Sequence, residues 1–155
     1  MEKYPNLFSP ITIRNHTYRN RVIFGPTMFA AGVLLPEIGE NIYRMVERRA
    51  KGGAAEVATG EMCVNTEEGD CLLSAPVDYS VHEGHMFNVF KEYADRIKKH
   101  GAIAMMEFGH DCAYAEVKPP HHPYGPIAFV REDGVEVKAM DEAMMSKIII
   151  ASSMA

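Results

Sequence analysis

Three short apolar runs, separated by segments of helical periodicity, constrain the fold of this chain more than any other feature. The runs cover residues 22–26, 54–60 and 102–108, and each has the length of a buried strand. Residues 39–51 and 83–100 lie between them and carry apolar side chains at helical spacing. This alternation predicts a parallel sheet in an α/β protein, but it does not by itself separate a closed barrel from an open sheet.

The first predicted helix has a recognisable end and a charged outer face. Gly52 follows residues 39–51 at the place where a helix is expected to stop. The outer face carries two oppositely charged pairs four residues apart, Glu40–Arg44 and Glu47–Lys51.

The remaining segments are predicted from turn and cap residues. Residues 11–14 and 17–19 are prone to form strands, and Asn15-His16 between them predicts a small hairpin because Asn tolerates a left-handed turn. A polar loop is expected from residue 61 to about residue 81, and another over residues 109–138 with a short hairpin at Asp133-Gly134. Asp141 is predicted to cap a third helix that begins at Glu142, with Met144, Met145, Ile148 and Ile149 as its apolar face.

Composition argues against several classes of partner. The net charge is −5 and the chain has no dense Lys/Arg cluster, so we expect neither nucleic acid nor a membrane surface to be bound. No run of about 18 apolar residues occurs, and the first residues lack a signal-peptide core, so a cytoplasmic location is expected. The three cysteines, Cys63, Cys71 and Cys112, form no CxxC motif and are expected to be reduced thiols.

Two further site types are disfavoured. The group His110, Cys112, His121 and His122 has zinc-ligand chemistry, but its spacing matches no familiar zinc motif, so we expect no metal. The first strand is not followed by GxGxxG, which argues against a dinucleotide-binding fold.

The motifs in their order resemble those of the old yellow enzyme family. Residues 7–11 (LFSPI) and 20–26 (NRVIFGP) are similar to its opening, and residues 58–61 (ATGE) to the end of its second strand. Residues 106–110 (MEFGH) stand where the family usually has Q-L-x-H, and residues 124–126 and 140–142 resemble its loop and third-helix start. The branch that includes the 2,4-dienoyl-CoA reductases and bile-acid-type enoate reductases is most similar.

The resemblance implies a fold and a cofactor. Residues 1–155 would be the N-terminal part of an FMN-binding domain, a partial TIM (β/α)8 barrel with a hairpin and about three βα units. Sites in such barrels form where strands end. The residues then implied to line part of the flavin pocket are Pro26, Thr27, Met28, Gly60 and Glu107. No catalytic residue is expected within this chain.

The implied activity belongs to a longer parent protein. NAD(P)H would reduce FMN, and the flavin would reduce the C=C bond of a small enoate or enoyl thioester. An iron–sulfur cluster and a second flavin are expected only in a longer parent. Two alternatives stay open. In the first, the chain alone is an inactive truncated fragment or a split-enzyme subunit, which needs an oligomeric partner or a missing C-terminal portion. In the second, it belongs to a dihydroorotate-dehydrogenase-like FMN barrel.

Two positions depart from the family pattern. An ionised Glu107 can only accept hydrogen bonds, whereas the usual Gln also donates one. We therefore expect a protonated Glu107 or a less easily reduced flavin, unless Glu107 is a rim carboxylate paired with an Arg. Met28 stands where many relatives have Thr or Cys, so the usual tuning contact is expected to be missing.

Overall fold

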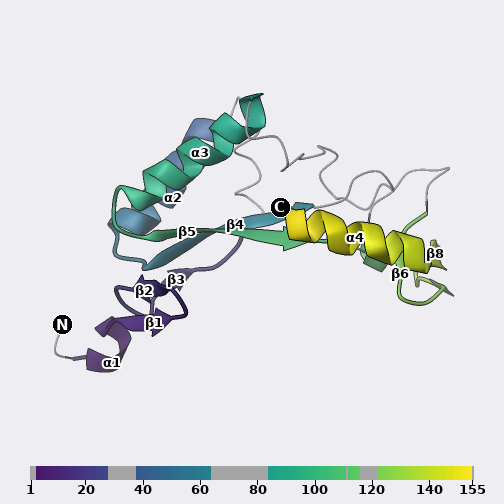
Figure 1. The fold of residues 1–155 in the computed structure, drawn as a ribbon, viewed down its shortest axis with the longest axis horizontal. Helices are drawn as coiled ribbons and strands as arrows, with labels where there is room; N and C mark the ends of the chain where they lie inside the picture. The colour runs from purple at the N-terminus through teal and green to yellow at the C-terminus, as the bar shows by residue number, and fades with distance from the viewer. Residues whose placement is uncertain (1–2, 28–37, 64–83, 111, 116–121, 155) are drawn as a thin grey trace. The chain divides into compact units, whose positions relative to one another are not determined.

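The structure, a computed structural model, describes residues 3–27, 38–63, 84–110, 112–115 and 122–154 (Figure 1). The chain divides into two compact units, residues 1–61 with 83–107, and residues 62–82 with 108–155. The prediction that residues 1–155 belong to one incomplete domain stays a prediction. No helix among the described residues is long and apolar enough to cross a membrane.

The first unit opens with the short helix α1 (Pro5–Phe8) and the antiparallel hairpin of β1 (Ile11–Ile13) and β2 (His16–Tyr18). The predicted hairpin is therefore confirmed. The left-handed residue is Arg14, with φ of 51°, and not Asn15 as expected. Arg14 is the first residue of the two-residue turn, and a positive φ only at this position matches a type II′ turn.

A three-stranded sheet in the order β3-β4-β5 follows, from strands β3 (Ile23–Phe24), β4 (Glu56–Cys63) and β5 (Ile103–Gly109). Strand β3 is parallel to β4. Between β4 and β5, the N–H of Ile103 donates to the Ala55 carbonyl, and the N–H of Glu107 donates to Thr59 Oγ1. From the first of these hydrogen bonds to the second, the donor residue and the acceptor residue both move four positions toward the C-terminus. Strands β4 and β5 are therefore parallel. The predicted parallel sheet is confirmed, although β4 continues past the expected loop start at residue 61.

Helices α2 (Gly39–Lys51) and α3 (Gly84–Lys98) lie side by side over one face of this sheet (Figure 1). The core between them contains Val46, Val57 and Ile97, whose side chains are fully buried. Burying one such side chain stabilises the fold by about 1.5–3 kcal/mol. The predicted end of α2 is also confirmed, because Gly52 caps it and donates to the Arg48 carbonyl at 2.8 Å.

The guanidinium group of Arg19 helps to join the hairpin to the sheet. Arg19 donates hydrogen bonds of 2.7 Å to the carbonyls of Ala50, Ala54 and His100. Ala50 lies in the last turn of α2, while Ala54 and His100 precede β4 and β5. Arg19 therefore lies at the end of the sheet where strands begin and helices finish.

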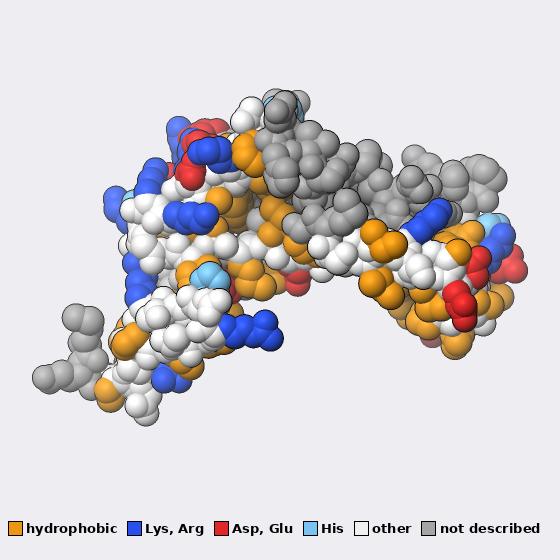
Figure 2. All heavy atoms as spheres, viewed as in Figure 1, with side chains coloured by type: hydrophobic (Ala, Val, Ile, Leu, Met, Phe, Trp, Pro, Cys, Tyr) orange, Lys and Arg blue, Asp and Glu red, His pale blue; other side chains and the backbone are white. Residues whose placement is uncertain are grey.

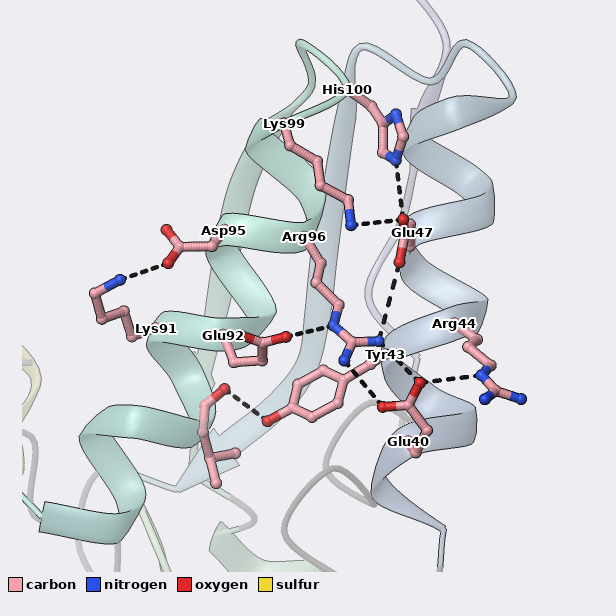
Figure 3. A network of polar contacts seen from close by, with 11 residues as sticks. Glu40, Tyr43, Arg44, Glu47, Lys91, Glu92, Asp95, Arg96, Lys99 and His100 are labelled. Carbon is pink, nitrogen blue, oxygen red and sulfur yellow. Dashed lines mark hydrogen bonds and ion pairs between the residues drawn. The ribbon is translucent and has the colours of Figure 1, made fainter.

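An ion-pair network connects the exposed sides of α2 and α3 (Figure 3). Arg96 of α3 pairs with Glu92 at 2.6 Å and with Glu40 of α2 at 2.9 Å, and it lies over the Tyr43 ring at 4.7 Å. Positive and negative side chains consequently alternate on the surface above these helices (Figure 2). The predicted Glu40–Arg44 pair is confirmed, with N···O at 3.0 Å.

The other predicted pair on α2 is wrong. Glu47 contacts α3 and its following turn, with Lys99 Nζ at 2.7 Å and His100 Nε2 at 3.2 Å, instead of Lys51 (Figure 3). The hydrogen bond from Lys99, and then that from His100, lowers the pKa of Glu47 to about 2. Packing of α3 against α2 brings Lys99 and His100, which follow α3, to the Glu47 carboxylate, and Glu47 therefore pairs with them.

The second unit contains the 3₁₀ turn η2 (Cys112–Tyr114), strands β6 (Tyr124–Gly125), β7 (Phe129–Val130) and β8 (Glu136–Ala139), and helix α4 (Glu142–Met154). Strands β7 and β8 are antiparallel around Gly134, so the predicted hairpin is confirmed. Asp141 Oδ1 accepts the Met144 N–H at 2.8 Å, as a helix cap does. The expected apolar face of α4 is not buried, since Met145 is 43% and Ile149 68% exposed.

Candidate functional site at the strand ends

Three of the predicted residues lie toward the carboxyl ends of β3, β4 and β5. Ile23 lies opposite Glu56 and Phe24 opposite Val57, and Thr27 follows three residues after the end of β3. In a parallel ladder the bond from the Ile103 N–H to the Ala55 carbonyl pairs Ile103 with Glu56, which sets Glu107 opposite Gly60. Thr27, Gly60 and Glu107 therefore mark the same edge of the sheet.

Glu107 is oriented by the alternation of side chains along β5. Ala104 packs against the helix-side core, so residues 105 and 107 point to the face that α2 and α3 leave uncovered. Met105 on that face is 44% exposed. The backbone of Glu107 is held by Thr59, whose Oγ1 accepts its N–H at 3.2 Å and whose side chain is only 2% exposed.

Thr27 carries an unsatisfied polar atom. Its Oγ1 is buried and has no hydrogen-bond partner among the described residues. A buried hydroxyl without a partner costs about 1–3 kcal/mol, and most buried polar groups in folded proteins avoid this cost. The unpartnered Thr27 hydroxyl is therefore the feature of this edge that most strongly suggests a bound ligand.

The other predicted site residues differ in what they supply. Pro26 is exposed and lacks an N–H group. Gly60 has no side chain, so another group can approach its backbone closely. Met28 lies outside the described residues.

Two cavities are lined by described residues. One of about 240 Å³ lies at β3 and the end of α2, and Phe24 and Arg49 are among the residues that line it. The other, of about 600 Å³, lies in the second unit and is lined by Tyr114, Phe129, Val130, Arg131, Glu132 and Asp133. Neither cavity includes a predicted flavin residue.

The residues considered for metal binding do not form a described cluster. Among the described residues, no group of three or more His, Cys, Asp or Glu side chains could hold a metal ion, and His121 and Cys71 lie outside that part. His110 and Cys112 do meet, with Nδ1···Sγ at 2.8 Å. The sequence grouped Cys112 with His110 only as part of a disfavoured zinc set and predicted a reduced thiol, and the signal for their contact was the one-residue spacing between them.

Comparison with known proteins identifies the family. Residues 6–153 match the family model described as NADH:flavin oxidoreductase / NADH oxidase. The chain belongs to this family. As a member of the NADH:flavin oxidoreductase family, it bears out the resemblance that the motifs indicated.

Solved structures agree on the fold. Histamine dehydrogenase from Rhizobium sp. 4-9 matches 99% of the chain at 18% identity with a TM-score of 0.75, and 2-naphthoyl-CoA reductase matches 97% at 22% identity with a TM-score of 0.71. Old Yellow Enzyme from Pichia sp. AKU4542 matches 94% at 18% identity with a TM-score of 0.72. The chain spans 24%, 25% and 40% of these three proteins. The predicted fold class, part of a (β/α)8 barrel, is confirmed, and the described residues form no closed barrel.

Proposed function

We propose that this chain supplies part of the FMN pocket of a flavin-dependent oxidoreductase of the NADH:flavin oxidoreductase family. The observation that carries the proposal is the buried Thr27 hydroxyl, which has no hydrogen-bond partner among the described residues and follows β3 toward the sheet edge that Gly60 and Glu107 approach. Barrel enzymes use this edge of the sheet for their ligands. The opposite edge, where Arg19 binds three carbonyls, serves stability instead.

Each residue of the proposed pocket has a task that its chemistry permits. Thr27 Oγ1 donates a hydrogen bond to a polar edge of the flavin, and Gly60 allows the flat ring to lie close to the backbone. Pro26 and Met28 provide apolar contact. Glu107 accepts from the imide N–H of the flavin, on the face that the helices leave uncovered.

The reaction proposed for the parent protein is reduction of an activated C=C bond. Bound FMN supplies hydride transfer, from NAD(P)H to an enoate or enoyl thioester. The structural likeness to 2-naphthoyl-CoA reductase, which was solved with 2-naphthoyl-CoA, supports a thioester as the substrate class. Cytoplasmic location, and an iron–sulfur cluster and second flavin in a longer parent, are parts of the same proposal.

A second candidate is a fragment or split subunit that needs further barrel strands before it acts. It is compatible with the apolar side chains exposed on the uncovered sheet face, Ile23 at 57% and Met105 at 44%. Apolar groups on an inner barrel face are normally covered by side chains from other strands. In this case the isolated chain binds FMN weakly, and the completed protein binds it well.

The test measures FMN affinity by quenching of flavin fluorescence, in the chain and in any longer parent. Thr27→Val keeps the side-chain shape and removes the hydroxyl, so we expect about fivefold weaker FMN binding. Thr12→Val, in the exposed hairpin, is the matched control and should leave the affinity unchanged. A parent that is colourless and indifferent to FMN, or equal affinity for Thr27→Val and the unaltered protein, overturns the proposal.

A further inference from the structure

A thiol and an imidazole meet just beyond the carboxyl end of β5. The strand ends at Gly109, and His110 Nδ1 lies 2.8 Å from Cys112 Sγ. Both residues are partly buried, and neither is fully enclosed by the described residues. Cys112 begins the turn η2 with φ of 51°, a conformation that side chains rarely adopt.

The turn that holds the pair is firmly packed. Ala113 and Ala115 are 7% and 2% exposed, and Arg131 Nη1 donates to the Ala113 carbonyl at 3.4 Å. Gly125 of β6 approaches so closely that a Cβ there would lie 3.3 Å from Ala113 Cβ. Cys112 therefore begins a turn whose following residues are held by packing and by a hydrogen bond.

This geometry brings together the two parts of an activated nucleophile. A thiolate, and not a thiol, is the reactive form of cysteine, and a neighbouring imidazole can accept the thiol proton. Only a few per cent of an ordinary thiol is ionised at pH 7, so pairing with a base raises its reactivity by about tenfold or more.

We propose that Cys112 is a nucleophilic site, activated by His110, that adds to electron-poor carbon–carbon double bonds. The thiol proton passes to His110 Nδ1, and the sulfur electron pair forms a C–S bond at the β-carbon. The π electrons move to the α-carbon, which takes the proton back from the imidazolium. No atom is oxidised or reduced overall, and the step requires no flavin, so it does not rest on the proposed function.

The experiment follows alkylation of each cysteine by N-ethylmaleimide, an activated alkene. A short pulse at pH 7 is quenched, the protein is unfolded, and the remaining thiols are labelled with a heavy-isotope form of the reagent. Peptide mass spectrometry then gives a separate rate for Cys112, Cys63 and Cys71. We expect Cys112 to react about tenfold faster than in His110→Gln, since Gln keeps polarity but cannot take up the proton.

The matched control is Arg131→Gln, which removes another contact to the same turn and leaves the imidazole in place. It should keep the fast rate. An equal loss in both variants, or no loss in His110→Gln, overturns the proposal. Should His110→Gln not fold, the unaltered protein decides, because a Cys112 rate no higher than that of glutathione at the same pH also overturns it.

Discussion

The hydroxyl of Thr59 accepts the backbone N–H of Glu107 at 3.2 Å, and this contact joins β4 to β5 where both approach the candidate pocket. Thr59 is almost fully buried, at 2% exposed. Glu107 thus occupies a position supported by its neighbour strand, on the level of Gly60. Thr59 does not face the candidate pocket, but it holds the backbone of Glu107, whose side chain is proposed to contact the flavin.

Replacing Thr59 by Val removes the acceptor but keeps the side-chain shape. The Glu107 N–H then loses the hydroxyl acceptor, so we expect a loss of about 1 kcal/mol in the free energy of unfolding. Urea denaturation followed by circular dichroism measures it. Thr12→Val, whose hydroxyl contacts Thr17 in the exposed hairpin, should change stability by less than about 0.5 kcal/mol. Equal losses in the two variants would contradict the role given to Thr59.

Replacing Glu107 by Gln tests the electronic effect of the departure from the family pattern. A carboxylate near the flavin opposes the negative charge gained on reduction, whereas Gln donates a hydrogen bond to it. We expect the flavin of a parent protein carrying Glu107→Gln to have a higher reduction potential. Spectroelectrochemical titration measures the potential, and Glu56→Gln, at the other end of the sheet, is the control. An unchanged potential in Glu107→Gln would argue against contact with the flavin.

Replacing Arg19 by Met should detach the hairpin from the sheet. Three carbonyls, on Ala50, Ala54 and His100, lose a charged donor at 2.7 Å. Hydrogen bonds to charged groups contribute about 1.5–3 kcal/mol each, but bonds from one group are not additive, so we expect a loss of about 2–4 kcal/mol. Thermal and urea unfolding measure it. The exposed Arg21 is the matched site, and a similar loss in Arg21→Met would show that charge alone is responsible.

Acid should weaken the link between α2 and α3. The pKa of Glu47 is lowered to about 2 in the folded chain by Lys99 and His100, below the ordinary value of 4.5. A depressed pKa means that the carboxylate stabilises the fold above about pH 5, and that this stabilisation is lost as the pH falls toward 2. Glu47→Gln should therefore show a smaller fall in melting temperature between pH 5 and pH 2 than the unaltered chain.

Salt provides the check on this pH effect. The pair is near the surface, so added salt screens it and should bring the two melting curves closer together. Arg44 pairs with Glu40 at the exposed side of α2 and lowers the pKa of Glu40 less than Arg96 does, so Arg44→Gln should keep more of the acid sensitivity than Glu47→Gln. Identical pH profiles for Glu47→Gln and the unaltered chain at low salt would contradict the prediction.

Local patterns were sufficient where one segment decides its own structure. The helical spacing in residues 39–51 and the glycine after them predicted α2 to the residue, and Asp141 predicted the start of α4. Partners from distant segments were missed for the same reason. Glu47 was assigned to Lys51 one turn away, yet it binds Lys99 and His100, because only packing of α3 brings them within reach.

The candidate pocket divides in the same way. The amino-acid sequence alone determined that strands alternate with helices, that the sheet is parallel, and that Pro26, Thr27, Gly60 and Glu107 fall near strand ends, since these follow from local periodicity and chain order. The tertiary structure decided the register that sets Gly60 opposite Glu107, the burial of the Thr27 hydroxyl and the meeting of His110 with Cys112. Register and burial depend on contacts between segments that are far apart in the chain, so no local sequence pattern predicts them.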